Sequence, residues 1–84
     1  DRFGNLITNL PEALFAADRG MPVVTVAGQR IRGLADSYAA VPTGRPGAIV
    51  GSAGTLEIFL PGGSAAAALG VTRGAAVTVT FTRE

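Results

Sequence analysis

Short apolar and β-branched runs, separated by glycine and proline, recur along the 84 residues of the chain. We expect strands over 5–8, over 21–27 and, after a turn in "AGQR", on through Ile31. "AIVGS" and "TLEIFL" predict two more strands, separated by Ala53 and Gly54. "AAVTVTFT" alternates apolar residues with Thr, the period of a strand buried on one face. The pattern predicts a mainly β fold, a small β-barrel with two short helices.

Two local sequence signals, a capping box and a turn followed by an N-cap, each predict a short helix. "NLPE", starting at Asn9, resembles a capping box with proline in the first turn and predicts a helix over 10–17, with Gly20 able to end it. "PGGSAAAALG" predicts a turn, an N-cap at Ser64 and a single-turn helix that ends near Gly70.

The segment 33–47 has no sustained period and carries proline and glycine at its far end, so it predicts a long loop containing Tyr38. Long loops in compact domains tend to be functional. We find no repeat and no internal boundary, and the 48% hydrophobic content suffices for one modest core, so residues 1–84 are expected to form a single domain. The chain begins without Met and enters an ordered-looking motif at once, which favours a segment of a longer protein.

Composition excludes several classes of site. The chain has neither Cys nor His, which argues against structural zinc, disulfides and thiol catalysis. Seven Arg and six acidic residues give a net charge of +1 without a basic run, which argues against a nucleic-acid partner. No apolar stretch approaches the roughly 18 residues of a membrane span. We therefore expect a cytoplasmic protein with no membrane partner.

The titratable residues predict no self-contained catalysis. Without His, a nucleophilic triad would lack a base that titrates near neutrality. The carboxylates are far apart in the sequence, and each is most simply a solvated surface group, with the exception of Glu57, which interrupts an apolar strand. The glycine clusters "GSAG" and "PGGS" are weak phosphate motifs and are more simply turns.

Asn5 is the most informative polar residue. Its carboxamide offers a donor and an acceptor side by side and can pair with the N6/N7 edge of adenine. Phe3 and Tyr38 could supply flat surfaces, and stacking a base on an aromatic ring contributes ~1–3 kcal/mol. A simpler interpretation stays open, since Asn beside Gly is ordinary in turns and aromatic residues are more often part of a core.

The segments "DRFGNLITN" and "GSAGTLEIFLPGGSAAAALG" resemble the C-terminal domain of the S-adenosylmethionine hydroxide adenosyltransferases, whose wider family includes the fluorinase and the chlorinase. The resemblance implies an N-terminal α/β domain ahead of this chain and a homotrimer. Each pocket for S-adenosylmethionine would lie between the N-terminal domain of one subunit and the C-terminal domain of its neighbour. It implies no metal and no cofactor, since S-adenosylmethionine is the substrate.

The resemblance also implies which residues contact the adenosine part of the substrate. Asn5 matches the carboxamide that reads adenine, and Phe3 would pack beside it. Tyr38 falls near the aromatic that contacts the purine ring. Backbone groups around Leu60 to Gly62 would complete the contacts with the adenine edge.

Other matched positions concern the methionine part and the choice of nucleophile. Asp1 matches the acidic residue that holds the substrate's amino group, and Ser52 the serine near its carboxylate. Ile7 stands where the halogenating members have Trp, and Ala53 stands where they have an arginine after the serine. Both differences favour the hydrolytic branch of the family.

The resemblance therefore implies that the full-length protein is a hydrolase in which water or hydroxide attacks C5' of the ribose and displaces methionine, giving adenosine. Residues that orient or activate water are expected on the N-terminal domain, so we name no catalytic residue in this chain and expect it to be inactive alone. Three alternatives remain open at this stage: a non-enzymatic adenine- or nucleoside-binding module, a halogenase domain, and a structural barrel that trimerises its parent.

Overall fold

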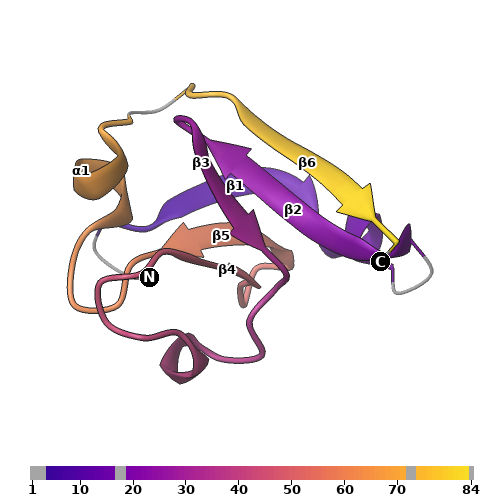
Figure 1. Cartoon of the computed structure of the whole chain (residues 1–84), viewed down its shortest axis with the longest axis horizontal. Coiled ribbons are helices and arrows are strands. Elements are labelled where there is room, and N and C mark those ends of the chain that lie inside the picture. The colour runs from indigo at the N-terminus through magenta and orange to yellow at the C-terminus, as the bar shows by residue number, and fades with distance from the viewer. Residues whose placement is uncertain (1–3, 17–18, 72–73, 84) are drawn as a thin grey trace.

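The computed structural model describes residues 4–16, 19–71 and 74–83. Over these residues, six strands form two three-stranded antiparallel sheets, of strand order β1-β5-β4 and β3-β2-β6 (Figure 1). The prediction of a mainly β fold is confirmed. The sheets are not closed into a barrel, because in the described part of the chain no strand of one sheet pairs with a strand of the other.

The first sheet has β5 at its centre. Its strands are β1 (Leu6–Pro11), β5 (Thr55–Phe59) and β4 (Gly47–Val50). Glu57 lies in register between Ile7 of β1 and Ile49 of β4. The pairing of β1 with β5 becomes irregular between Ile7 and Pro11.

The second sheet has β2 at its centre, and its strands are β2 (Met21–Val26), β3 (Gln29–Arg32) and β6 (Val77–Thr82). Ala27 and Gly28 connect β2 to β3 with φ angles of 52° and 79°. Positive φ at both central residues is the geometry that matches the twist of a two-residue hairpin. The hairpin expected at "AGQR" is confirmed.

The two sheets pack face to face around one apolar core. Alternate residues of β2 and β5 point inward, and α1 (Ala65–Leu69) adds a small side chain at one end. Removing such side chains from water contributes roughly 1.5–3 kcal/mol for each large aliphatic residue. The buried members of this core are Val24, Val26, Ile31, Ala48, Leu56, Ile58 and Ala65.

The helix expected after "PGGS" is confirmed. The side chain of Ser64 accepts a hydrogen bond from the backbone N–H of Ala67 at 3.2 Å, which caps α1. Gly70 ends the helix with a φ of 67°, in the left-handed region that glycine tolerates.

The prediction of a helix over 10–17 is wrong for residues 10–16, and Ala17 lies outside the described residues. β1 continues through Pro11, and only a 3₁₀ helix, η1 (Glu12–Phe15), follows it. Pro11 is extended and makes no side-chain capping bond, while the N–H of Glu12 donates to the carbonyl of Gly54 at 2.9 Å. Pairing with the other strands therefore overrides the local capping signal.

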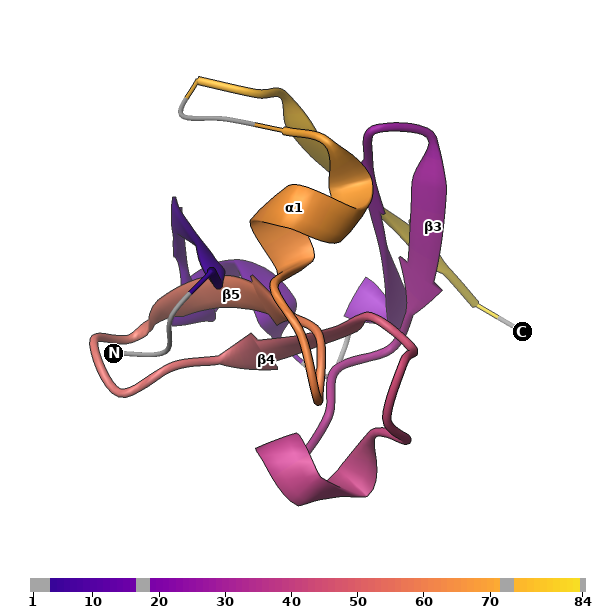
Figure 2. The same ribbon diagram turned by 90° about the vertical axis from the view of Figure 1, so that its left-hand side faces the viewer.

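The loop expected over 33–47 is confirmed except at Gly47, which begins β4. Its one helical element is the 3₁₀ helix η3 (Tyr38–Ala40). Figure 2 shows this segment on the side of β4 opposite to α1. The central strand β5 is thus covered on both faces of the sheet, with Tyr38 of η3 against Glu57 and Phe59, which explains why its four successive residues 56–59 are buried. Within the described ranges, no helix is long and apolar enough to cross a membrane.

Candidate functional site

Glu57 is a buried carboxylate on the outer face of the first sheet. Leu56 and Ile58 point into the core, so the strand alternation turns Glu57 and Phe59 to the opposite face. Only 9% of the surface of Glu57 is exposed. Charged side chains are rarely buried to this extent without hydrogen-bond partners.

The partners of Glu57 are two of the residues expected at the adenine site. Its Oε1 accepts a hydrogen bond from Asn5 Nδ2 at 3.3 Å and another from the Tyr38 hydroxyl at 3.0 Å. The Tyr38 ring packs edge-on against Phe59, with 4.9 Å between ring centroids and 77° between planes. The fold therefore places the residue that precedes β1 and the first residue of η3 within hydrogen-bond distance of one carboxylate of β5.

Gly51 leaves the room that this carboxylate occupies. A Cβ atom at position 51 would lie 2.0 Å from Glu57 Oε2 and 2.6 Å from its Cδ. Gly47, at the other end of β4, similarly admits Phe59, whose Cζ would lie 2.8 Å from a Cβ at that position. Glycine is thus required at 51 and 47 by close packing rather than by a special φ.

Asn5 is held in place by the start of α1. The carbonyl of Gly4 accepts a hydrogen bond from Ala66 N–H at 2.9 Å. Gly4 has a φ of 84°, and a Cβ there would lie 2.2 Å from Ser64 Oγ. The glycine before Asn5 therefore lets the chain enter β1 directly beneath the helix.

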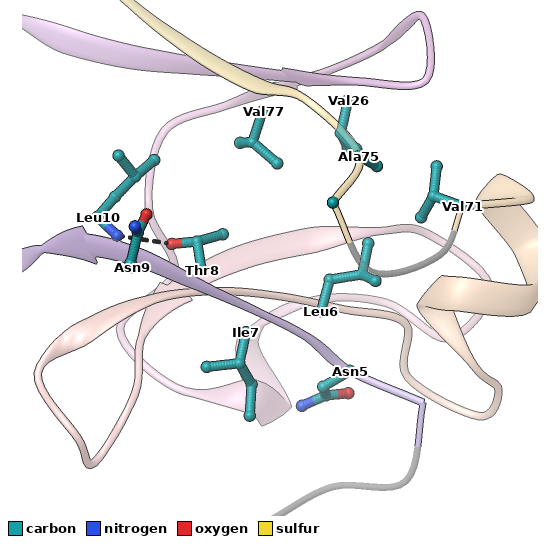
Figure 3. Close-up of a pocket in the computed structure, with 11 residues that line it drawn as sticks. Asn5, Leu6, Ile7, Thr8, Asn9, Leu10, Val26, Val71, Ala75 and Val77 are labelled. Carbon is teal, nitrogen blue, oxygen red and sulfur yellow. Dashed lines mark hydrogen bonds between the residues drawn. The ribbon is translucent and has the colours of Figure 1, made fainter.

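Ile7 lies on the same face of β1 as Asn5. It is directly opposite Glu57 in the register and has 58% of its surface exposed. Figure 3 shows Asn5 and Ile7 on one side of β1 and Leu6 on the other. An exposed isoleucine beside an anchored carboxamide forms a surface that is part apolar and part polar.

The remaining predicted site residues lie at the two ends of β5. Ser52 is exposed in the turn before the strand, next to Gly51. Leu60 follows the strand and packs against the core, while Gly62 is exposed, with Thr43 Cγ2 2.8 Å from where its Cβ would be. The structure thus brings Asn5, Tyr38 and Ile7 together around Glu57. Ser52, Leu60 and Gly62 lie away from this cluster, at the ends of β5. The predicted residues Asp1 and Phe3 lie outside the described residues.

An open groove of about 760 Å³ runs along β1 on the side that faces β6. Figure 3 shows side chains of β1 lining it together with residues from the start of β6 and the segment before it. The lining includes residues from both faces of β1, Asn5 and Ile7 among them, but neither Tyr38 nor Ser52. Among the described residues no group of three or more His, Cys, Asp or Glu could hold a metal ion.

Sequence reasoning did not place Glu57 and Gly51 at the site. The available signal was an acidic residue inside the apolar run "TLEIFL", together with a glycine at the end of the preceding strand. This signal does not identify the hydrogen-bond partners of Glu57, because Asn5 and Tyr38 come from other parts of the chain.

Comparison with known proteins identifies relatives of the whole domain. The chain is 42% identical over 74 residues to the (R)-S-adenosyl-L-methionine hydrolase of Thermus thermophilus. Its fold matches the crystal structure of an uncharacterized conserved protein from Thermotoga maritima, with a TM-score of 0.76, 33% identity and 95% of this chain covered. It also matches the crystal structure of a conserved hypothetical protein from Thermus thermophilus, with a TM-score of 0.74, 42% identity and 94% coverage.

These relatives are longer than the chain. The alignment covers 88% of this chain but 27% of the Thermus hydrolase, and the chain covers 32% and 31% of the two crystal structures. The family model for the SAM hydroxide adenosyltransferase C-terminal domain matches residues 1–78. The chain therefore belongs to the S-adenosylmethionine hydroxide adenosyltransferase family, as a C-terminal domain of that family.

Proposed function

We propose that this chain is the substrate-binding domain of an adenosine-forming S-adenosylmethionine hydrolase. The observation that carries the proposal is the 42% identity, across 88% of the chain, to a protein named as an S-adenosyl-L-methionine hydrolase. The match of residues 1–78 to the C-terminal domain of the family supports it independently.

In the proposed reaction, the oxygen of water attacks C5' of the ribose while the bond from C5' to the sulfonium sulfur breaks. The sulfur keeps the electron pair and leaves as methionine, and water loses one proton, so the products are adenosine, L-methionine and H⁺. The sulfonium is already a good leaving group, so the protein must mainly hold oxygen, C5' and sulfur in line and exclude bulk water.

The layout of the domain is compatible with an extended substrate. Asn5 and Tyr38 both donate hydrogen bonds to Glu57 in β5. Residues 60–62 follow this strand, and Ser52 precedes it. A strand of five residues spans about 13 Å at the usual rise of ~3.3 Å. We propose adenine contacts from Asn5, Tyr38 and residues 60–62, and contacts with the methionine carboxylate from Ser52.

Other parts of the proposal concern residues and subunits beyond the described structure. Asp1 would hold the substrate's amino group and Phe3 would pack beside adenine. An N-terminal α/β domain of a neighbouring subunit would form the other wall of the pocket and activate water, in a cytoplasmic homotrimer that needs no cofactor. Ile7 would contribute apolar contact, because more than half of its surface is exposed.

The test is the activity of the complete parent protein on S-adenosylmethionine, with chromatography for adenosine and methionine. We expect both products in equal amounts, unchanged by chloride or fluoride. Asn5→Ala should lower kcat/KM about 5- to 150-fold, the usual value of a bidentate contact with a base.

Three results would count against this proposal. A halogenated nucleoside as the main product would favour the halogenase alternative. Adenosine binding without turnover would favour the nucleoside-binding module. An unchanged kcat/KM in Asn5→Ala would remove Asn5 from the adenine site.

A further inference from the structure

The hydrogen bond between Asn5 and Glu57 fixes more than the position of Asn5. A carboxylate oxygen accepts hydrogen bonds and has no hydrogen to donate, so the amino end of a carboxamide, not its oxygen, must face it. Asn5 Nδ2 lies 3.3 Å from Glu57 Oε1, as this requires. Glu57 therefore determines which way round the Asn5 carboxamide lies.

This orientation leaves a defined pattern for a ligand. The Nδ2 amino group has two hydrogens, and Glu57 takes one of them. With the hydrogen trans to Oδ1 donated to Glu57, the second hydrogen and Oδ1 lie side by side, as a donor and an acceptor. Adenine offers the complementary edge, with an acceptor at N7 and a donor at its 6-amino group. A 6-oxo purine would place its own oxygen against Oδ1, where two acceptors face each other.

Glu57 is confined enough to impose the orientation. Its Oε1 also accepts from the Tyr38 hydroxyl at 3.0 Å, and the Tyr38 ring is seated against Phe59. Its Oε2 lies against Gly51, where even a methyl group would not fit. Because only 9% of the residue is exposed, the carboxylate cannot exchange these partners freely for water. Hydrogen bonds to a charged acceptor are also stronger than neutral ones.

We propose that Glu57 is a positioning residue that holds the Asn5 carboxamide in the orientation that selects a 6-amino purine over a 6-oxo purine. This inference rests on the proposed function, in which Asn5 contacts the adenine of S-adenosylmethionine.

The experiment compares two substrates of the complete parent protein: S-adenosylmethionine and the analogue in which hypoxanthine replaces adenine. The measured quantity is kcat/KM for S-adenosylmethionine divided by kcat/KM for the hypoxanthine analogue. Glu57→Met removes the acceptor at similar length and should lower the ratio about 5- to 150-fold, the value of one base-specific bidentate contact. Glu57→Gln keeps an oxygen that can accept from Asn5 and should retain part of the preference.

Thr8→Val is the matched control for loss of contact between β1 and β5. Thr8 Oγ1 donates to the carbonyl of Leu56 at 2.8 Å and accepts from the N–H of Leu10 at 3.1 Å, on the other face of β1. This variant should leave the substrate ratio unchanged. An unchanged ratio in Glu57→Met, or an equal fall in Thr8→Val, would overturn the positioning role.

Two further outcomes separate this inference from the proposed function. If the wild-type protein hydrolyses neither substrate, the proposed function fails, and the ratio of Kd values for adenosine and inosine in the same variants tests Glu57 instead. If Glu57→Met does not fold, a crystal structure of the wild-type protein with adenosine decides. Asn5 Nδ2 within hydrogen-bond distance of both Glu57 and adenine N7, with Oδ1 facing the 6-amino group, supports the inference. A carboxamide with Oδ1 turned toward Glu57, or Nδ2 out of reach of Glu57, contradicts it.

Discussion

Gly51 and Glu57 show how one missing side chain supports a site. The carboxylate occupies the space in which a Cβ of residue 51 would lie, so the two positions are fixed together. Burying a charge is costly unless hydrogen bonds compensate, and here the donors are Asn5 and Tyr38. The arrangement of Asn5 thus depends on a glycine that is distant from it in the sequence.

Gly51→Ala should destabilise the domain. The added methyl group would overlap Glu57, which is buried and cannot move aside, so we expect a loss of about 1–3 kcal/mol in the free energy of unfolding, measured in urea. Ala53→Ser, two positions on in the same exposed turn, is the control and should change it by less than about 0.5 kcal/mol. Equal stability of Gly51→Ala and the wild type would mean that the carboxylate is not confined.

The elements differ in how far the sequence alone predicts them. The β2–β3 hairpin and the capped helix α1 depend on nearby residues, and both were predicted. The helix over 10–17 was not formed, because β1 extends to Pro11 and Gly54 accepts the hydrogen bond of Glu12 N–H. That contact is distant in the sequence, so no local pattern predicts it.

The candidate site was likewise only partly predictable from the sequence. Asn5 and Tyr38 were singled out by their side-chain chemistry and then by resemblance to a family, and the structure joins them. Their common partner, Glu57, comes from a strand far from both in sequence. A charge inside an apolar strand marks a residue that needs partners, but only the strand order and register identify them.

At the scale of the element, Ser64→Ala should weaken α1. Loss of the bond from Ala67 N–H to Ser64 Oγ should cost about 0.5–2 kcal/mol of stability and speed hydrogen exchange at Ala67. Ser37→Ala is the control, because Ser37 precedes η3 but its side chain makes no capping bond. Unaltered exchange at Ala67 would show that the cap contributes nothing.

At the scale of the molecule, the inner face of the first sheet builds the core, and the proposed ligand contacts lie on its outer face. The inner face supplies Leu56 and Ile58 to the core, both with 0% of their surface exposed. The outer face presents Ile7, with 58% exposed. Residues on the two faces should therefore respond differently to the same chemical change.

Ile58→Val and Ile7→Val remove the same methylene group from neighbouring strands. Ile58→Val should lower the free energy of unfolding by about 0.5–1.5 kcal/mol, because the space left in the core cannot fill completely. Ile7→Val should change it by less than about 0.5 kcal/mol. Thermal denaturation of both variants checks this, and similar losses at the two positions would contradict the division between faces.

The open edges of the two sheets bear on how the domain behaves when produced in isolation. β1 and β6 are outer strands, and neither "LITNLP" nor "VTVTFT" contains a charged residue. Outer strands without charges are templates onto which other chains add by backbone hydrogen bonding, and proline offers limited protection at one end of β1. Concentrated preparations of the isolated domain should therefore be prone to aggregate through strand addition. Lysines introduced at exposed positions of β6 should reduce this aggregation.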